Sequence, residues 1–230
     1  MMTLMPRPNP NWQPGDKIKS PVDEMIRVDP EEIGVAERYK LLIGSIVPRP
    51  IAFVSTIDSQ GQGNLAPFSF YNGVSSSPPC VVFSVSRKPD GSKKDTLLNI
   101  EQTKQFVINS ANMWLAEPLV QCGANYPHGV DEMQLSGLTA VAAERVKPAR
   151  VKESAISMEC ELYQLVEIGD GSPGSACLVI GRIILFHVAK QVYQLGKIDL
   201  SQLQPLSRLG GFAYGETSVA FELKVPGGAG

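Results

Sequence analysis

The chain has 230 residues, a formal net charge of −2 and 43% hydrophobic residues. A chain of this length can bury one sizeable core, and a nearly neutral chain has no general attraction to nucleic acid or to an anionic membrane surface. No apolar run approaches the roughly 20 residues that span a bilayer, and residues 1–20 lack the apolar core of a signal peptide. We therefore expect a cytoplasmic protein with neither nucleic acid nor a membrane as partner.

Composition also divides the chain into two parts. Residues 1–20 are rich in Pro and Asn, which predicts an extended N-terminal arm, and residues 21–230 fit a single domain. The cysteines lie far apart without a Cys-x-x-Cys pair, so we expect buried thiols rather than disulfides or a metal site. These cysteines are Cys80, Cys122, Cys160 and Cys177.

The first half of the chain alternates β-rich runs with turn residues. Residues 31–42 predict a short helical or irregular segment, and residues 50–57 (PIAFVSTI) predict the first strand. The glycines of residues 58–63 accept positive φ angles and predict a hairpin turn. The next stretch, residues 64–71, consists of residues whose backbone can approach a ligand closely. Residues 80–86 (CVVFSVS) are apolar on both faces and predict a central strand.

Residues 105–122 predict a strand followed by a helix. Gln105–Ser110 has the β-rich pattern of a strand. The helical pattern of residues 113–122 contains Pro118, which is tolerated only near a helix start, so this helix is expected to begin near Ala116.

The remaining pattern is mostly β. Residues 125–135 predict a loop with a short helix. Residues 153–168 and 176–189 predict two long strands, and the sequence GDGSPG between them is typical of a hairpin turn. Many apolar strands separated by Gly and Pro favour a barrel or a sandwich.

A cluster of basic residues surrounds the turn at residues 89–91. Ser92 and Asp95 have the spacing of a capping box, which predicts a helix that continues to about Lys104. A helix start offers unpaired N–H groups and partial positive charge, so the segment could hold a phosphate. The alternative is a solvated, well-capped turn. The basic residues are Arg87, Lys88, Lys93 and Lys94.

Other catalytic patterns are weak. Gly61, Gly63 and Ala66 match the loose dinucleotide pattern G-x-G-x-x-A, but Pro67 disfavours the helix that a Rossmann fold requires there. His187 lies in an apolar strand pattern and is expected to be satisfied locally. His128 lies in a loop, where it could approach a ligand or face water.

Several separated blocks resemble one family. The runs VPRPIAFVSTID, NLAPFSFYNGVSSSPP and KDTLLNI, followed by LVIGRIILFHV and PLSRLGGFAY, are similar to the flavin reductase-like proteins with an FMN-binding split barrel. The resemblance covers about residues 39–214. It implies a mainly β fold, namely a six-stranded antiparallel Greek-key barrel with flanking helices. It also implies a homodimer that binds FMN and, in many members, reduction by NADH or NADPH.

The resemblance carries a set of site residues over to this chain. It implies that the ring and ribityl chain of FMN contact the strand around residues 55–70 and that the phosphate lies near residues 87–96, with Asp95 capping the helix or bonding ribityl hydroxyls. Arg49, Arg208 and Tyr214 could shape the site or the dimer, or only pack. The FMN-binding residues so implied are Arg49, Ser55, Thr56, Asn64, Leu65, Ala66, Ser69, Phe70, Arg87, Lys94, Asp95 and Thr96.

Three functions fit this reading. The first is an NAD(P)H-dependent flavin reductase that supplies reduced flavin or electrons to a monooxygenase or another redox partner. The second is an electron carrier like flavoredoxin, which keeps FMN bound without nicotinamide turnover. The third is a binding protein that has lost redox use. In each case the flavin ring accepts the hydride, so no side chain is expected to act as a catalytic acid or base.

Overall fold

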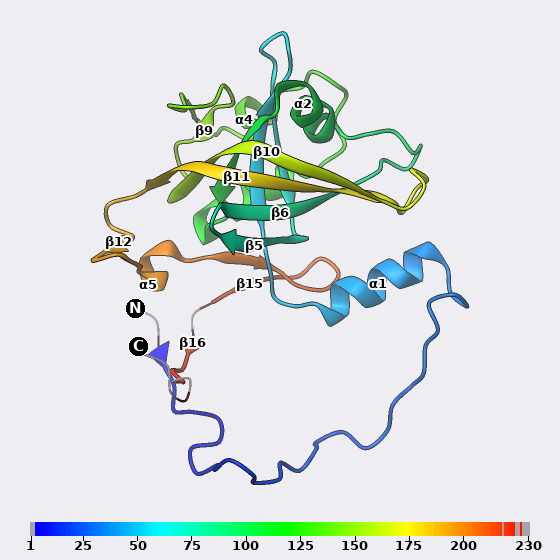
Figure 1. Ribbon diagram of the computed structural model, residues 1–230, viewed down its shortest axis with the longest axis vertical. Coiled ribbons are helices and arrows are strands. Elements are labelled where there is room, and N and C mark those ends of the chain that lie inside the picture. The colour runs from blue at the N-terminus through cyan, green and yellow to red at the C-terminus, as the bar shows by residue number, and fades with distance from the viewer. Residues whose placement is uncertain (1–2, 218, 224–225, 227–230) are drawn as a thin grey trace.

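Seven antiparallel strands form the main sheet, in the order β4-β3-β7-β10-β11-β6-β5. The computed structural model describes residues 3–217, 219–223 and 226. The edge strands β4 and β5 are consecutive in the chain, and only residues 69–70 separate them, so the sheet curls back on itself as a barrel (Figure 1). The strands are β3 (Ala52–Ile57), β4 (Gly63–Phe68), β5 (Tyr71–Ser76), β6 (Pro79–Ser86), β7 (Gln105–Ser110), β10 (Ile156–Ile168) and β11 (Ala176–Val188).

The predicted mainly β fold is confirmed, with two differences in detail. The sheet has seven strands rather than six, because the polar segment Tyr71–Ser76 pairs with β6 as an exposed edge strand. The strand predicted at residues 80–86 is β6, which lies next to this edge between β11 and β5 rather than at the middle of the sheet. The long strands β10 and β11 pair as the predicted hairpin.

Side chains from six strands of the sheet and from helix α2 fill the barrel interior. The strands are β3, β4, β6, β7, β10 and β11. Phe83 lies 5.2 Å from Phe68 and 5.5 Å from Phe106, centroid to centroid, and all three are buried. Gly181 leaves the space that the Phe106 ring occupies, since a Cβ built there would lie 2.2 Å from that ring. All four cysteines are free and buried, as predicted.

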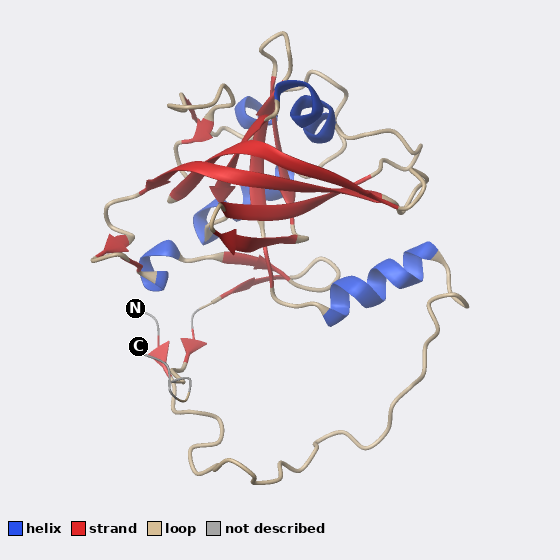
Figure 2. Ribbon diagram, viewed as in Figure 1, coloured by secondary structure: helices blue, strands red, loops and turns tan. Residues whose placement is uncertain are grey.

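The helices lie outside the barrel. In Figure 1, α2 lies at the top of the view above the strands and α1 lies along one side, and Figure 2 shows helices in blue around a mostly red sheet. Helix α3 begins at Ala116, as Pro118 predicts. The helices are α1 (Val35–Ser45), α2 (Asp95–Thr103), the 3-10 helix η1 (Met113–Leu115), α3 (Ala116–Gln121), α4 (Glu132–Leu135) and α5 (Leu200–Leu203).

Four small sheets complete the fold. The largest joins β15 (Tyr214–Glu216), β14 (Leu206–Arg208) and β2 (Arg49–Pro50), and the Arg208 guanidinium lies 4.4 Å from the Tyr214 ring centroid. A second core under this sheet includes Phe53, Leu65 and Leu206. The other pairs are β8 (Ala140–Val141) with β9 (Arg150–Val151), β12 (Tyr193–Gln194) with β13 (Lys197–Ile198), and β1 (Thr3–Leu4) with β16 (Val219–Ala220).

The N-terminal segment leaves the body of the molecule. Figure 1 shows it as a wide arc from β1 to the start of α1, and its side chains from Leu4 to Val28 are exposed. In the part of the chain that the structure describes, no helix has the length and apolar character needed to cross a membrane.

Candidate functional site

Helix α2 starts two residues later than the predicted capping box implies, because the N-cap is Lys94 rather than Ser92. It begins at Asp95 with Lys94 at the N-cap, and no side chain caps it. The Ser92 hydroxyl instead donates to Asp90 Oδ1 at 2.6 Å, because both residues belong to the tight turn before the helix. The predicted capping box is therefore wrong. Within the described residues, the backbone N–H groups of Asp95 and Thr96 have no hydrogen-bond partner.

Basic side chains gather at this helix start. Lys88 Nζ lies 3.6 Å from Asp95 Oδ1, and the exposed His128 places Nδ1 3.3 Å from the same oxygen. Burial, and then the charge of Lys88, lower the pKa of Lys94 below its usual value. Two neighbouring cations beside unpaired N–H groups favour a bound anion.

A chain of polar side chains ties the helix to strands β3 and β4. Asn64 Nδ2 donates to Thr96 Oγ1 at 2.9 Å and to Thr56 Oγ1 at 3.4 Å. Asn99 Nδ2 donates to Thr56 Oγ1 at 3.1 Å. Thr56 and Thr96 are almost fully buried, whereas Asn64 is half-buried. Of this set, Asn64 is therefore the residue most open to a ligand, and the threonines orient it.

Two predicted contacts on these strands are buried and already bonded. The Ser55 hydroxyl donates to the Ala149 carbonyl and accepts from Asn109 Nδ2 at 3.3 Å. The Leu65 side chain is fully buried, and its backbone N–H donates to Glu132 Oε2 at 2.9 Å. Both residues shape the strands rather than present free groups.

One cleft lies at the start of α2 and brings together Asn64, Ala66, Lys94, Asp95 and Thr96 from the predicted set. We call it the helix-start cleft. Its volume is about 70 Å³. Sequence reasoning missed its other wall, the loop after α3 together with Glu132, although the glycine and short polar residues of that loop were a signal of close approach. The residues added are Lys88, Pro67, Phe68, Cys122, Gly123, Ala124, Asn125, Tyr126 and Glu132.

Glu132 is an acidic residue of this wall that is buried. It is only 8% exposed and comes from the short helix α4, whose N-cap Asp131 accepts hydrogen bonds from the N–H groups of Met133 and Gln134. Burial raises the pKa of the Glu132 carboxyl above its usual value, although its hydrogen bond from Leu65 N–H opposes the shift. Glu132 therefore fastens α4 to the outer edge of β4 between Asn64 and Ala66.

A second, wider cleft of about 390 Å³ lies between α1 and the link from β4 to β5. It is lined by Arg49, Ser69 and Phe70 from the predicted set, together with apolar residues of α1. We call it the Phe70 cleft. Along an extended strand, Asn64 and Ser69 are about 17 Å apart, so the two clefts lie at the two ends of β4. The remaining lining residues are Leu42, Ile46, Pro48, Pro50, Tyr71 and Asn72.

Arg49 is held rigidly in this cleft. Its guanidinium donates to the carbonyls of Ile43, Ile46 and Leu209, and it is only 3% exposed. Its Nε also donates to Ser69 Oγ at 3.4 Å, and its Cζ lies 6.0 Å from the Phe70 ring centroid. Arg49 thus packs against backbone carbonyls of three segments and lines the Phe70 cleft, and its contact with FMN stays a prediction.

Arg87 does not join either cleft. Its Nη2 pairs with Glu167 Oε2 on β10 at 2.7 Å, and its Nε is buried without a partner among the described residues. The charge at the helix start therefore comes from Lys88 and Lys94 instead.

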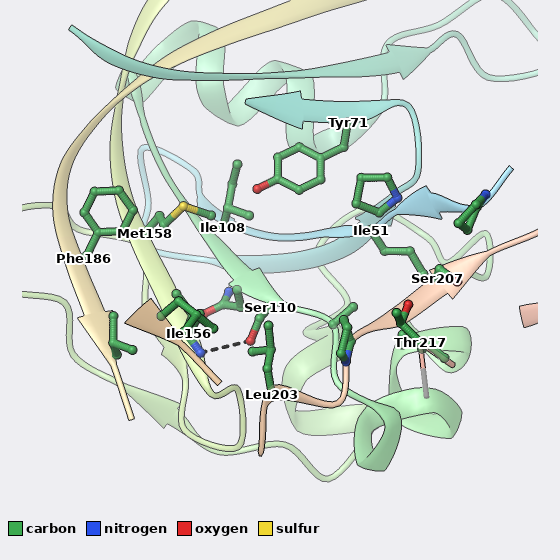
Figure 3. A pocket seen from close by; sticks show the side chains of 18 residues that line it. Ile51, Tyr71, Ile108, Ser110, Ile156, Met158, Phe186, Leu203, Ser207 and Thr217 are labelled. Carbon is green, nitrogen blue, oxygen red and sulfur yellow. Dashed lines mark hydrogen bonds between the residues drawn. The ribbon is translucent and has the colours of Figure 1, made fainter. Parts of the chain in front are cut away.

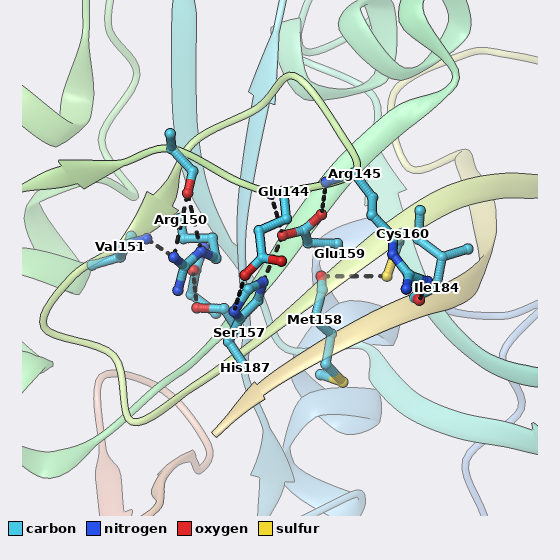
Figure 4. Close-up of polar contacts among 12 residues, drawn as sticks. Glu144, Arg145, Arg150, Val151, Ser157, Met158, Glu159, Cys160, Ile184 and His187 are labelled. Carbon is cyan, nitrogen blue, oxygen red and sulfur yellow. Dashed lines mark hydrogen bonds and ion pairs between the residues drawn. The ribbon is translucent and has the colours of Figure 1, made fainter. Parts of the chain in front are cut away.

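His187 is satisfied locally, as predicted. Its Nε2 lies 2.6 Å from Glu159 Oε1, and this fully buried carboxylate also accepts from the N–H groups of Glu144 and Arg145 (Figure 4). The cluster fastens residues 142–149 to strands β10 and β11. The carbonyl of Ala149 at the end of this segment accepts from Ser55.

Comparisons with known proteins agree with this architecture. Residues 43–199 match the family model described as the flavin reductase like domain. An uncharacterized protein from Halalkalibacterium halodurans is 38% identical over 202 residues, which cover 87% of this chain and 97% of that protein. The structure of nitrilotriacetate monooxygenase component B from Bacillus cereus is 37% identical with a TM-score of 0.84, and the match covers 88% of this chain and 100% of that one.

A more distant structure agrees in fold. A split-barrel protein from Shewanella frigidimarina, assigned as a flavin reductase, is 23% identical with a TM-score of 0.76, and the match covers 87% of this chain and all of that one. The fold is thus that of a split-barrel protein. The chain belongs to the flavin reductase-like family.

Proposed function

We propose that the chain binds FMN along strand β4, with the phosphate in the helix-start cleft and the ring in the Phe70 cleft. The observation that carries this proposal is the pairing of two clefts at the ends of β4. The small one holds two lysines beside the unpaired N–H groups of α2, and the wide one is lined mostly by apolar residues. FMN has the same polarity, a phosphate at one end and a flat apolar ring at the other.

The side chains present fit both ends of this molecule. Lys88, Lys94 and the unpaired N–H groups at the start of α2 would hold the phosphate. The half-buried Asn64 would bond the ribityl chain, and Phe70 with Ser69 would orient the ring. Each charge-assisted hydrogen bond contributes about 1.5–3 kcal/mol, so a few of them support micromolar binding. We propose that four residues of the predicted set support the site indirectly, by holding the neighbouring strands and side chains in place. They are Ser55, Thr56, Leu65 and Arg87.

Bound FMN would supply a ring atom that accepts a hydride from NADH or NADPH, and reduced flavin or its electrons would pass to a partner. The similarity to component B of a monooxygenase favours a partner of that class. The residues of this chain then bind and orient the two small molecules, exclude water and need not exchange protons with them.

We propose further that the chain acts as a homodimer in the cytoplasm. From Tyr39 to Val47, helix α1 and the residues after it expose five large apolar side chains, which is a typical surface for a partner subunit. The four free thiols suit a reducing compartment. Light scattering should give twice the chain mass of 24.9 kDa, and a mass of one chain would contradict the dimer. The exposed residues are Tyr39, Leu41, Leu42, Ile46 and Val47.

Steady-state oxidation of NADH and NADPH, with FMN in excess, tests the activity. We expect turnover that depends on added FMN with at least one nicotinamide. Absence of turnover with both would contradict the reductase. Bound flavin that is photoreduced and then reoxidised by a protein partner would instead support the carrier.

A further inference from the structure

A third cavity, the largest of the three, lies at the end of the barrel opposite α2. It measures about 480 Å³ and is bounded by the ends of β7, β10 and β11 and by the segments around α5 and β14 (Figure 3). Its walls are mostly aliphatic and aromatic, with Ile156, Met158 and Phe186 on one side and Leu203 on another. Both the volume and the lining are typical of pockets that bind small molecules. We call it the barrel-mouth cavity.

Most polar side chains of this cavity are already engaged. Ser110 Oγ donates to Asn112 Oδ1 at 2.8 Å and accepts from the Ile156 N–H at 3.0 Å. Ser207 Oγ donates to the Gly215 carbonyl at 3.0 Å. Neither hydroxyl therefore has a free hydrogen for a ligand.

The Tyr71 hydroxyl, unlike those of Ser110 and Ser207, can still donate a hydrogen bond to a ligand. It points into the cavity toward Ile108 and Met158, and within the described residues it has no hydrogen-bond partner (Figure 3). Burial raises the pKa of this phenol to about 12, so it stays protonated and can donate at neutral pH. An unpaired donor in an apolar setting favours a ligand that supplies an acceptor.

We propose that the barrel-mouth cavity binds a small, uncharged, largely apolar molecule with one carbonyl or similar oxygen that accepts a hydrogen bond from Tyr71. The apolar walls disfavour a charged ligand, because none of the described residues that line the cavity carries a charge to pair with it. Thr217 also lines the cavity, but it is exposed to solvent, so the half-buried Tyr71 hydroxyl supplies the donor for a ligand inside the cavity. An aromatic ketone or aldehyde with one ring has this chemistry.

This site is distinct from the proposed flavin site but adjacent to it. Tyr71, Pro48 and Pro50 line both the barrel-mouth cavity and the Phe70 cleft, and the Tyr71 hydroxyl points into the barrel-mouth cavity. The inference does not rest on flavin binding, since every group in it belongs to the chain itself.

Calorimetric titration of the purified full chain with acetophenone tests the proposal. We expect a dissociation constant on the order of 0.1 mM, which is reasonable for a ligand of this size. Tyr71→Phe should weaken binding about five-fold, because it removes one hydrogen bond without changing shape. Tyr163→Phe is the matched control, since Tyr163 is 60% exposed on β10 and should leave the affinity unchanged.

Two further measurements locate the ligand. Ethylbenzene, which lacks the acceptor, should bind wild type and Tyr71→Phe equally. Val188→Trp should place a large ring in the cavity and weaken binding of both molecules. Failure of wild type to bind acetophenone would overturn the proposal, as would equal affinity of wild type and Tyr71→Phe. Because the titration contains no added flavin, either failure leaves the proposed FMN site untouched.

Discussion

Glu132 is a residue whose role only the three-dimensional structure reveals. The sequence places it 67 positions after Leu65, yet its carboxylate accepts from the Leu65 N–H at 2.9 Å. No local pattern predicts a hydrogen bond between residues so far apart. Asn64 and Ala66, on either side of Leu65, came instead from the family resemblance, and both line the helix-start cleft.

Replacing Glu132 should separate its two effects. Glu132→Ala leaves the buried Leu65 N–H unpaired, so we expect a loss of about 1–3 kcal/mol in the free energy of unfolding and an FMN dissociation constant about tenfold higher. Glu132→Gln keeps an acceptor of the same length and removes charge near the phosphate, so FMN should bind at least as tightly as in wild type. Chemical denaturation and fluorescence titration measure the two quantities. If Glu132→Ala binds FMN like wild type, Glu132 does not position β4 for the ligand.

Arg87 is a residue for which the sequence suggested a contact that the structure places elsewhere. Its place in a basic cluster predicted a phosphate contact, but the guanidinium faces Glu167 on the neighbouring hairpin instead. Charge clusters in sequence indicate a region, not the direction of each side chain. Lys94 is the N-cap residue of α2 and lines the helix-start cleft, and its contact with a phosphate stays a prediction.

At the scale of elements, the sequence predicted the strands that have a local apolar pattern better than it predicted the edge strand β5 and the start of α2. Gln105–Ser110 and the β10–β11 hairpin were predicted because apolar patterns and Gly-rich turns are local. The edge strand Tyr71–Ser76 and the start of α2 were not. Edge pairing depends on β6, and the helix start depends on a turn that engages Ser92.

The buried Glu159 carboxylate holds the loop of residues 142–149 against the sheet. Burial alone would raise the pKa of Glu159, but hydrogen bonds from Glu144 N–H, His187 and Arg145 N–H together hold it below its usual value. A carboxyl with a lowered pKa in the folded state contributes stability above its unfolded pKa, near 4.5, and loses that contribution as pH falls through the folded pKa.

The matching prediction compares wild type with Glu159→Gln from pH 7 to pH 3. At pH 7 the variant should be less stable by about 1–3 kcal/mol, because it weakens charge-assisted hydrogen bonds to two backbone N–H groups. The difference should shrink as the pH falls below about 4.5, since wild type then protonates Glu159. Thermal unfolding measures it. A difference that stays constant over this range would show that the Glu159 charge does not stabilise the fold.

At the scale of the whole molecule, the family resemblance predicted the barrel. The structure adds how the N-terminal segment of the chain is arranged relative to it. The predicted arm of residues 1–20 and the exposed stretch that continues to Val28 make few contacts with the body. The family match begins only at residue 43. We therefore propose that residues 1–20 form an arm outside the barrel domain.

Deleting residues 1–20 should leave the domain intact. Since the deleted side chains are exposed, we expect the unfolding temperature of the barrel to change by less than about 3 °C. Circular dichroism with a thermal ramp measures it, and light scattering on the same sample reports whether the arm contributes to the proposed dimer. A much larger fall in unfolding temperature would show that residues 1–20 belong to the domain.

The most direct test of the whole account is a parallel titration of FMN and riboflavin into wild type and Lys94→Ala, followed by flavin fluorescence. Lys190→Ala, an exposed lysine in a turn outside both clefts, is the control. We predict micromolar FMN binding by wild type and an approximately tenfold loss in Lys94→Ala, with riboflavin affinity nearly unchanged. Equal losses for FMN and riboflavin, or no binding of either by wild type, would contradict the proposal that β4 and the start of α2 together hold the flavin.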